Sequence, residues 1–336
     1  MIEPTARVRL GRTALHVSRL GFGSAPLGGL LRATSDQDAA AAVETALTAG
    51  LSHFDTAPQY GGGLAEQRLG AALRKVARDR FVVSTKIGKI VRLTSNAPPQ
   101  TVGFVGAPGH EILYDYSYDG VRRSLDASFE RLGVDRVDIV FIHDVNRKYH
   151  GERVHERLEE ALGGACKALA ALRDQGVIKA FGPATKDVDI AAAFVERADI
   201  DCLMLPARYT MLDHSAAVTL LPACLARGVA VVAAAPFDSG ILATGAVAGA
   251  TYDYQPASVE VMSRVKAIEA LCARFQVPIA AAALQFPLQH PAVASVVTGM
   301  RSASEVRQNL QLMRTPVPAD FWPALGTGNG GSQTRR

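Results

Sequence analysis

Short apolar segments alternate with longer amphipathic segments along almost the whole of this 336-residue chain. Most of the short segments are continuous apolar runs, a pattern typical of parallel strands that are covered on both faces. The runs predict barrel strands at residues 20–22, 52–55, 81–85, 137–143, 178–182, 202–205, 229–235 and 293–298. About eight strand–helix units over roughly 300 residues match the size and rhythm of a (β/α)8 TIM barrel.

An open, doubly wound sheet produces the same alternation, so the pattern alone leaves two α/β architectures open. A GxGxxG motif after the first strand would favour the open sheet. Residues 21–26 carry only part of that spacing, and Pro26 interrupts it. We therefore predict a single (β/α)8 barrel domain over residues 1–325 and a flexible, glycine-rich C-terminal tail over 326–336.

Two segments are added to this alternation. Residues 7–17, with a turn at Gly11 and Arg12, predict a β-hairpin before the first barrel strand. Residues 88–117 follow the third strand, are rich in Pro, Gly and polar residues, and predict a long loop insertion. Loops of this length are usually functional or disordered, and we expect this one to overhang the barrel mouth and shape a pocket. Between the later strands we expect single helices over 156–175 and 215–227.

Composition excludes several classes of protein. Hydrophobic residues make up 48% of the chain, and 36 Lys and Arg against 32 Asp and Glu give a net charge of +4. The basic residues are scattered, whereas a nucleic-acid platform needs them clustered with aromatic residues. The longest apolar runs, such as 229–237, are too short to cross a bilayer, and the first ten residues contain no apolar export signal.

The cysteines are widely spaced, form no CxxC pair and lie in apolar surroundings, at Cys166, Cys202, Cys224 and Cys272. This usage predicts buried free thiols in a reducing compartment. We therefore expect a cytoplasmic protein, a monomer or homo-oligomer, that acts on a small molecule and has no nucleic-acid or membrane partner.

Ionisable residues end three successive predicted strands. The second strand ends at Asp55, the third at Lys86 and the fourth at His143. In a barrel the carboxyl ends of the strands form the active-site face, so these side chains are expected to meet there. Tyr60 follows the second strand in a glycine-rich loop and becomes a fourth candidate.

These four residue types suit proton transfer at an alcohol or carbonyl oxygen. A lysine ammonium beside a tyrosine favours the phenolate and lowers the pKa of the tyrosine, and Asp55 would keep Lys86 charged and in place. His143 would hydrogen-bond the reacting oxygen. Each residue also has a structural alternative, because an aspartate often caps a turn and a tyrosine in a glycine-rich loop is more often packing.

The same segments resemble a known family. The stretch FDTAPQYGGGLAEQRLGAAL is similar to the DTAxxYG segment of the aldo-keto reductase superfamily, STKIG to its lysine strand and VDIVFIHD to its histidine strand. The resemblance extends from Leu10 to Phe321. Residues 114–120, 207–213 and 236–242 resemble the branch that contains L-fucose (D-threo-aldose) 1-dehydrogenases and pyridoxal 4-dehydrogenase.

The resemblance implies a catalytic tetrad of Asp55, Tyr60, Lys86 and His143. Tyr60 would transfer the proton, Lys86 and Asp55 would tune it, and His143 would orient the reacting oxygen. Hydride would pass directly between the substrate carbon and C4 of a nicotinamide, NAD or NADP, without a metal. His150 and His155 have no supporting Cys or carboxylate spacing, so we expect no metal site.

Cofactor contacts are implied in the same way, at Thr185, Tyr209, Pro236, Phe237, Ser239, Gly240, Leu242, Gly299, Arg301, Ser302, Glu305, Gln308 and Asn309. Tyr209 would stack on the nicotinamide, the 236–242 loop would hold the pyrophosphate, and the start of the last barrel helix would hold the adenosine end. Many members have Ser-Asn after the fifth strand, where this chain has Ala184 and Thr185, so Thr185 remains the candidate for the carboxamide. Arg301 suits a 2′-phosphate and Glu305 a free ribose hydroxyl, which leaves NAD and NADP open.

The resemblance implies oxidation of the anomeric hydroxyl of an aldose, such as L-fucose or another D-threo-aldose type, to the lactone. Two alternatives stay within this chemistry, namely oxidation of pyridoxal and reduction of a general aldehyde or ketone. A third belongs to another class, a non-catalytic nicotinamide-binding regulatory subunit. Retention of all four tetrad residues argues against that last alternative.

Overall fold

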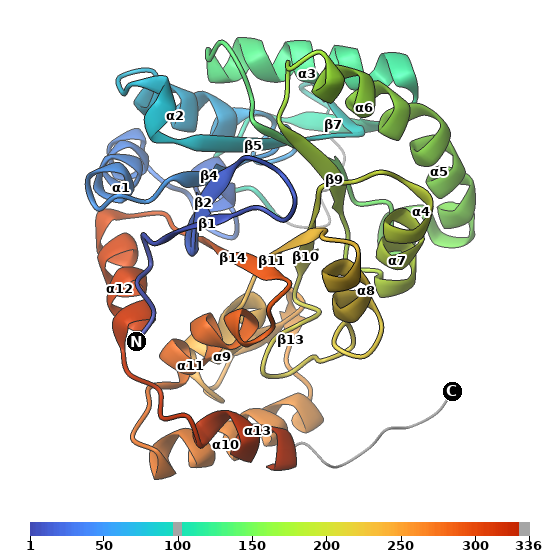
Figure 1. Ribbon diagram of the computed structural model, residues 1–336. Helices are drawn as coiled ribbons and strands as arrows, with labels where there is room; N and C mark the ends of the chain where they lie inside the picture. The colour runs from blue at the N-terminus through green and yellow to red at the C-terminus, as the bar shows by residue number, and fades with distance from the viewer. Residues whose placement is uncertain (97–102, 329–336) are drawn as a thin grey trace.

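Eight parallel strands close into a barrel in the order of the chain (Figure 1). The computed structural model describes residues 1–96 and 103–328. The barrel strands are β3 (Leu20–Gly23), β4 (His53–Asp55), β5 (Val82–Ile87), β8 (Ile139–His143), β9 (Ala180–Ala184), β10 (Cys202–Pro206), β11 (Ala230–Ala234) and β14 (Val293–Gly299). They overlap all the predicted strand positions, and the (β/α)8 prediction is confirmed.

Strand register sets the height at which functional side chains leave the barrel. Asp55, the last residue of β4, pairs with Ser84 in β5, and Lys86 lies two residues further along β5 beside Phe141. His143, the last residue of β8, pairs with Ala184 at the end of β9. Because all strands run parallel, these positions share the carboxyl end of the barrel, as the sequence predicted.

Most of the helices form an outer layer on the apolar faces of the strands, and the helices at 259–274 and 321–328 pack in a separate cluster outside that layer (Figure 1). The helices are α1 (Asp36–Thr48), α2 (Leu64–Leu73), α3 (Tyr118–Leu132), α4 (Arg147–His150), α5 (Val154–Glu160), α6 (Cys166–Asp174), α7 (Val188–Arg197), α8 (Leu220–Ala226), α9 (Ile241–Thr244), α10 (Val259–Arg274), α11 (Ile279–Gln285), α12 (Ala303–Arg314) and α13 (Phe321–Gly328). The Ser35 hydroxyl caps α1 by accepting from the Asp38 N–H, and the same device opens α3, α10 and α12.

Two predicted helices differ from the observed ones. The helix expected over 156–175 contains a π-helical turn at Ala161–Ala165 between α5 and α6, where Gly164 lies so close to the Tyr116 carbonyl that a Cβ would be 2.7 Å from its oxygen. The helix expected over 215–227 begins only at Leu220. Pro222 explains that start, because proline lacks an N–H and is best tolerated in a first helical turn.

A predicted hairpin lies at the amino end of the barrel. Strands β1 (Arg7–Arg9) and β2 (His16–Ser18) pair antiparallel, which confirms the hairpin expected over 7–17. Its turn residue Gly11 has a φ of +55° and lies so close to the Gly228 carbonyl that a Cβ there would be 2.5 Å from the oxygen. The turn therefore requires glycine for both reasons.

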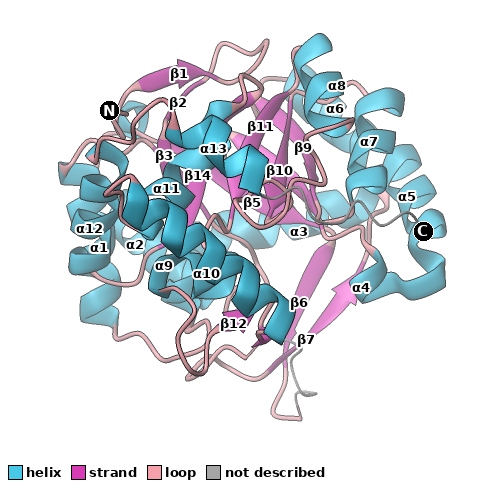
Figure 2. Cartoon of the chain, turned by 90° about the horizontal axis from the view of Figure 1, so that it is seen from below, coloured by secondary structure: helices cyan, strands magenta, loops and turns pink. Residues whose placement is uncertain are grey.

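The insertion after β5 is more regular than expected. Instead of a loop throughout, it forms an antiparallel hairpin of β6 (Lys89–Leu93) and β7 (His110–Tyr114) at the end of the barrel opposite β1 and β2 (Figure 2). Residues 97–102 of the insertion lie outside the described residues. A smaller hairpin, β12 (Thr251–Tyr252) and β13 (Gln255–Pro256), turns at Asp253 and Tyr254 with φ values of +47° and +63°.

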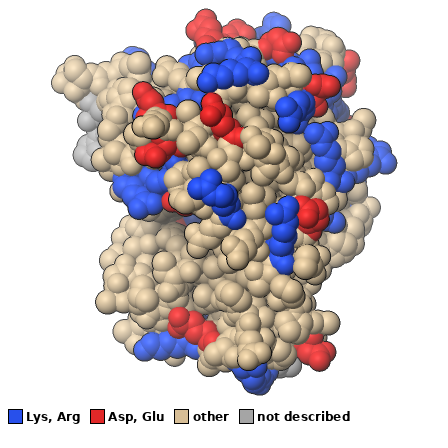
Figure 3. All heavy atoms as spheres, turned by 90° about the vertical axis from the view of Figure 1, so that its left-hand side faces the viewer, with Lys and Arg blue, Asp and Glu red and all other residues tan. Residues whose placement is uncertain are grey.

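The C-terminal boundary differs from the prediction, because α13 continues to Gly328 and so enters the segment expected to be a tail. The rest of that segment, 329–336, lies outside the described residues. The cysteines are free and buried, as expected. Among the described helices none is long and apolar enough to span a membrane alone; Val259–Arg274 and Ile279–Gln289 pass that test only as a pair bent by 101°. Basic and acidic side chains are interspersed on the face shown in Figure 3.

Candidate active site

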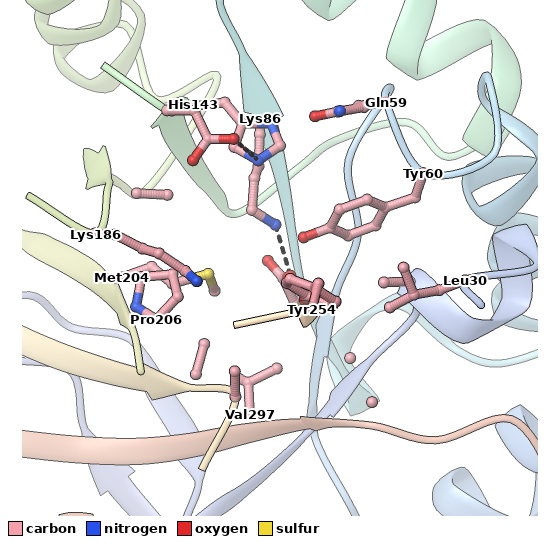
Figure 4. A pocket seen from close by; sticks show the side chains of 18 of the residues that line it. Leu30, Gln59, Tyr60, Lys86, His143, Lys186, Met204, Pro206, Tyr254 and Val297 are labelled. Carbon is pink, nitrogen blue, oxygen red and sulfur yellow. Dashed lines mark hydrogen bonds and ion pairs between the residues drawn. The ribbon is translucent and has the colours of Figure 1, made fainter. Parts of the chain in front are cut away.

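A cavity of about 210 Å³ opens at the carboxyl end of the barrel (Figure 4). One side is apolar, and the other carries charged and polar groups from the loops after β4, β5 and β8. The lining residues include Gly23, Leu30, Asp55, Gln59, Tyr60, Lys86, Phe104, His143, Asp144, Asn146, Lys148, Tyr149, Ala184, Lys186, Met204, Pro206, Ala234, Tyr254, Val297 and Gly299. The four predicted tetrad residues are all among them, and Phe104 confirms that the insertion helps to shape the pocket.

Lys86 and Asp55 form a buried ion pair at the base of the cavity. The Lys86 ammonium donates to Asp55 Oδ2 at 2.6 Å and to the Thr56 carbonyl at 2.8 Å. The Ser84 hydroxyl donates to the other carboxylate oxygen at 2.7 Å. Each Asp55 oxygen therefore has a partner within the barrel, which offsets the cost of removing the charges from water.

Tyr60 lies above this pair, with its hydroxyl directed toward the Lys86 ammonium (Figure 4). The ammonium is 4.9 Å from the centre of the Tyr60 ring, and the ring meets His143 edge-on with the ring centres 6.1 Å apart. The loop that carries Tyr60 passes close to Gly28. A Cβ at Gly28 would lie 2.7 Å from the Tyr60 carbonyl carbon, so this close approach requires glycine.

The pKa of Tyr60 is shifted in the direction opposite to the prediction. Burial raises it well above its usual value, and the carboxylates of Asp55 and Asp144 raise it further. The expectation of a lowered Tyr60 pKa therefore does not hold for the protein without ligands, because burial and the two carboxylates both disfavour the phenolate. Tyr60 is a neutral phenol in this state.

His143 ends β8 and its side chain is almost fully buried. Burial lowers the pKa of the imidazole well below its usual value, so the ring is neutral. Its Nε2 atom lies 3.5 Å from Asp144 Oδ2, and its buried Nδ1 atom has no hydrogen-bond partner among the described residues. A neutral imidazole has one N–H donor and one acceptor nitrogen, and His143 lines the cavity, so the ring can hydrogen-bond the oxygen of a ligand.

A second buried ion pair, which the sequence analysis missed, lies beside His143. Lys89, the first residue of β6, donates to Asp144 Oδ2 at 2.5 Å and to Gln59 Oε1 at 2.6 Å. Its ammonium is 3.8 Å from the centre of the Tyr149 ring. The signals in the sequence were the acidic residue directly after His143 and a lysine three positions after Lys86, but neither has an obvious partner along the chain.

The β12–β13 hairpin contributes the outer part of the cavity wall. Asp253 at its turn forms an ion pair with Lys186, and the Tyr254 ring lies between 5 and 6 Å from the Lys148 and Lys186 ammonium groups. The Tyr254 N–H donates to the Ser239 hydroxyl at 3.0 Å. The hairpin therefore links the pocket to the loop expected to hold a pyrophosphate.

Two predicted nicotinamide contacts are not among the cavity-lining residues. The Thr185 hydroxyl is buried and donates to the Val145 carbonyl at 2.9 Å. Tyr209 packs on Phe286 with the ring centres 4.9 Å apart. Of the predicted cofactor residues, only Gly299 lines the cavity.

The remaining predicted cofactor residues gather at two neighbouring places. Pro236, Phe237, Ser239, Gly240 and Leu242 form the turn before and within α9, and a Cβ at Gly240 would meet nothing within 4 Å. Ser302 caps α12 by accepting from the Glu305 N–H, and Glu305 accepts from the Arg301 N–H at 2.8 Å. The arrangement resembles a capping box, except that Glu305 accepts from the residue before the N-cap, and it gives Glu305 a structural role.

Arg301 is also engaged within the protein. Its guanidinium donates to the carbonyls of Leu30 and Arg32 and to the Thr34 hydroxyl, at 2.9–3.0 Å. Further along α12, Gln308 is exposed and Asn309 is buried. In the described part of the chain no group of three or more His, Cys, Asp and Glu could hold a metal ion.

The apolar side of the cavity fits a flat ring. Small residues at the ends of four of the barrel strands line it, namely Gly23, Ala184, Ala234 and Gly299. A Cβ at Gly299 would lie 2.9 Å from Pro26 Cγ, so a larger residue would disturb this surface. The wall faces the polar cluster of Tyr60 and His143, which suits a nicotinamide held next to a reacting oxygen.

Comparison with known proteins agrees with this geometry. The model of the aldo/keto reductase family matches residues 19–326. Pyridoxal 4-dehydrogenase of Microbacterium luteolum is 41% identical over 335 residues, which cover 96% of this chain and 97% of that protein. D-threo-aldose 1-dehydrogenase of a Pseudomonas species is 39% identical over 328 residues, 96% of each chain.

Two solved structures share the fold. A holo-form aldo-keto reductase from Bacillus halodurans superposes with a TM-score of 0.74 at 24% identity and covers 98% of this chain and 96% of its own. Glycerol dehydrogenase from Gluconobacter oxydans superposes with a TM-score of 0.76 at 19% identity, over 99% of both chains.

Proposed function

The chain belongs to the aldo/keto reductase family and is an NAD(P)-dependent oxidoreductase for a small molecule, and we propose that it oxidises the anomeric hydroxyl of an aldose of the L-fucose type to the lactone. The observation that carries this proposal is the single cluster formed by Tyr60, His143 and the Lys86–Asp55 pair next to an apolar wall. The 39% identity to D-threo-aldose 1-dehydrogenase supports the substrate class.

In this proposal Tyr60 is the proton-transfer group. Its oxygen, as the phenolate, receives the proton of the anomeric hydroxyl while the hydrogen on C1 leaves as hydride to the nicotinamide, which turns the cyclic hemiacetal into a lactone. His143 hydrogen-bonds the same oxygen and orients it. Lys86, held by Asp55, faces the Tyr60 hydroxyl and stabilises the phenolate that must exist before the proton is received.

The nicotinamide supplies the hydride acceptor, its C4 atom, when bound. We propose that its ring lies on the wall of Ala184, Ala234 and Gly299, and that the 236–242 turn and the start of α12 bind the rest of the cofactor. Arg301 and Arg32 are the candidate cations for a 2′-phosphate, and Glu305 is the candidate acceptor for a ribose hydroxyl, although Arg301 is already hydrogen-bonded within the protein and Arg32 pairs with Glu305. Both NAD and NADP therefore belong in the assay.

Pyridoxal is a second candidate substrate, because aromatic rings surround the polar side of the cavity. Phe104, Tyr149 and Tyr254 all line it, and aromatic pairs stabilise stacked or edge-on contacts with a flat heterocycle. The 41% identity to pyridoxal 4-dehydrogenase favours the same candidate. A pyridoxal molecule closed through its neighbouring hydroxymethyl group is also a cyclic hemiacetal, so the same residues would act on it.

The test is a panel of L-fucose, other aldoses, pyridoxal and simple aldehydes with NAD and NADP, followed by absorbance of the reduced nicotinamide. We expect L-fucose-type aldoses to have the highest kcat/KM. Tyr60→Phe should lower kcat by about 100- to 10,000-fold. Tyr149→Phe, which removes a hydroxyl from a different cavity-lining tyrosine, is the matched control and should retain most activity.

Two results would overturn the proposal. Activity of Tyr60→Phe equal to that of the wild type would remove Tyr60 from its role. Turnover of pyridoxal with no oxidation of any aldose would replace the sugar by the second candidate.

A further inference from the structure

Asp144 occupies a position that is costly for folding. It is a non-glycine residue with a φ of +55°, directly after the strand that carries His143. Its carboxylate is only 16% exposed, and burial of a charge requires compensation. Backbone strain together with a buried charge at the mouth of a cavity is characteristic of functional sites.

The partners of Asp144 hold its carboxylate in one orientation. Lys89 donates to Oδ2 at 2.5 Å, and the Asn146 side-chain amide donates to Oδ1 at 3.0 Å. Burial alone would raise the pKa of Asp144, but the neighbouring cations, Lys89 foremost, outweigh burial and lower it to about 2, so the carboxylate is ionised at neutral pH. An ionised carboxylate has about four acceptor positions, and these two donors leave some of them available.

Asp144 has free acceptor positions on the cavity side, unlike Asp55, the other carboxylate that lines the cavity. Asp55 is 4% exposed in its side chain, and both of its oxygens are held below the cavity by Ser84 and Lys86. Among the described lining residues, Asp144 is therefore the carboxylate that a ligand can reach. It can only accept hydrogen bonds, so it recognises a donor such as a hydroxyl group.

The place of Asp144 beside His143 indicates which hydroxyl it recognises. Asp144 Oδ2 is 3.5 Å from His143 Nε2, and Tyr60 contacts the same imidazole edge-on. A ligand oxygen held between Tyr60 and His143 is bonded to the reacting carbon. The next carbon of the ligand, with its substituent, would then lie near the Asp144 carboxylate. An aldose has a hydroxyl there, whereas a simple aldehyde has none.

We propose that Asp144, held by Lys89 and Asn146, is a specificity determinant that accepts a hydrogen bond from the hydroxyl on the carbon adjacent to the reacting carbon. Its substrate class is therefore the 2-hydroxy aldehydes and their cyclic hemiacetals. The identity of the sugar rests on the proposed function, but the preference for a neighbouring hydroxyl does not.

The experiment compares L-fucose with 2-deoxy-L-fucose in the wild type and in Asp144→Asn. A hydrogen bond to a charged group corresponds to about a 10- to 100-fold difference in kcat/KM, so we expect the wild type to prefer L-fucose by that factor. In Asp144→Asn the single amide oxygen remains with Lys89, and the preference should fall to about threefold or less. Loss of the preference, unlike loss of total activity, does not follow from a merely structural role.

Asp187→Asn is the matched control. Asp187 is also a half-buried aspartate paired with a cation, accepting from Arg147 Nη1 at 3.0 Å, but it does not line the cavity. This control should keep the wild-type preference. Thermal midpoints of both variants show whether either is unfolded, and Asp144→Ser offers a second neutral replacement if Asp144→Asn does not fold.

The same comparison in the reductive direction uses lactaldehyde and propanal, which differ by one hydroxyl next to the carbonyl. If no aldose is oxidised, the proposed function fails while this pair still tests Asp144. Equal kcat/KM values for lactaldehyde and propanal in the wild type, or an unchanged preference in Asp144→Asn, would overturn the inference.

Discussion

Two buried lysine–aspartate pairs lie near His143, and they differ in whether their carboxylates can be reached from the cavity. Lys86 and Lys89 are each 1% exposed, and their ammonium groups are 2.6 Å and 2.5 Å from Asp55 and Asp144. Both oxygens of Asp55 are held inside the barrel, whereas Asp144 faces the cavity. The first pair therefore acts on Tyr60 from below, and the second is placed to meet a ligand.

The chain produces the two pairs by different means. Lys86 belongs to β5, so the alternation of a strand directs its side chain into the barrel. Lys89 follows Gly88, which has a φ of +93° and lies so close to Tyr116 that a Cβ would be 2.2 Å from the ring. At this glycine the chain leaves the barrel and enters the β6–β7 hairpin, which brings Lys89 beside the loop after β8.

Replacing each lysine by methionine should distinguish the roles of the two pairs most clearly. In Lys86→Met the Tyr60 phenolate loses its cation, and we expect kcat to fall by about 100- to 10,000-fold. In Lys89→Met we expect kcat to fall by about tenfold or less and KM for a 2-hydroxy substrate to rise. Steady-state kinetics of the folded variants measure both, and equal losses of kcat would contradict the division of roles.

The next largest expected effect is the change in the free energy of unfolding when the Lys89–Asp144 pair is broken. Lys89→Met leaves the Asp144 carboxylate buried without its cation, which should lower the free energy of unfolding by about 3–5 kcal/mol. The double variant Lys89→Met/Asp144→Asn should recover more than half of this loss, because the amide needs no counter-charge. Urea unfolding at neutral pH measures both. A double variant no more stable than Lys89→Met would show that packing of the lysine stem matters more than charge.

The first pair could be predicted from the sequence and the second could not, for a physical reason. Asp55, Lys86 and His143 end apolar runs, and parallel strands place such ends at one edge whatever the details of packing. Lys89 lies two residues past the end of β5, at the start of the insertion. The direction of its side chain therefore depends on how the insertion folds, and the insertion was expected to be a loop. The two segments that form the hairpin, KIVRL at Lys89–Leu93 and HEILY at His110–Tyr114, do not alternate between polar and apolar residues, so their pattern is only a weak signal for strands.

Most of the cofactor residues implied by the resemblance do not line the cavity. Thr185 and Tyr209 follow the expected strands, yet their side chains are engaged with Val145 and Phe286. Glu305 could be recognised from the sequence as part of a capping-box pattern, because Ser302 stands three residues before it. Side-chain direction after a strand end depends on loop packing, which strand periodicity does not determine.

Asp238 provides a contrast with Asp55 and Asp144, because it is a buried aspartate that forms no ion pair among the described residues. It accepts from the Thr210 hydroxyl at 2.6 Å, and burial raises the pKa of Asp238 to about 7. The unfolded chain ionises near pH 4, so stability falls as the pH rises from about 4 to 7. Asp238→Asn should therefore raise the free energy of unfolding at pH 8 by about 4 kcal/mol and leave it nearly unchanged at pH 4. A gain independent of pH in urea unfolding would contradict this.

Asp144 should show the opposite dependence with a smaller amplitude. The neighbouring cations, Lys89 foremost, outweigh burial and lower the pKa of Asp144 from 3.8 to about 2, so its contribution is complete above about pH 4 and is lost as the pH falls toward 2. The contribution corresponds to about 2 kcal/mol. The difference in unfolding free energy between the wild type and Asp144→Asn should therefore shrink as the pH falls from 6 to 2.5. The difference between the wild type and Asp187→Asn, measured over the same range, is the reference for an ion pair outside the cavity. A difference that stays constant over this range would mean that Lys89 does not hold Asp144 ionised, and the second pair would then lose the property that distinguishes it from Asp238.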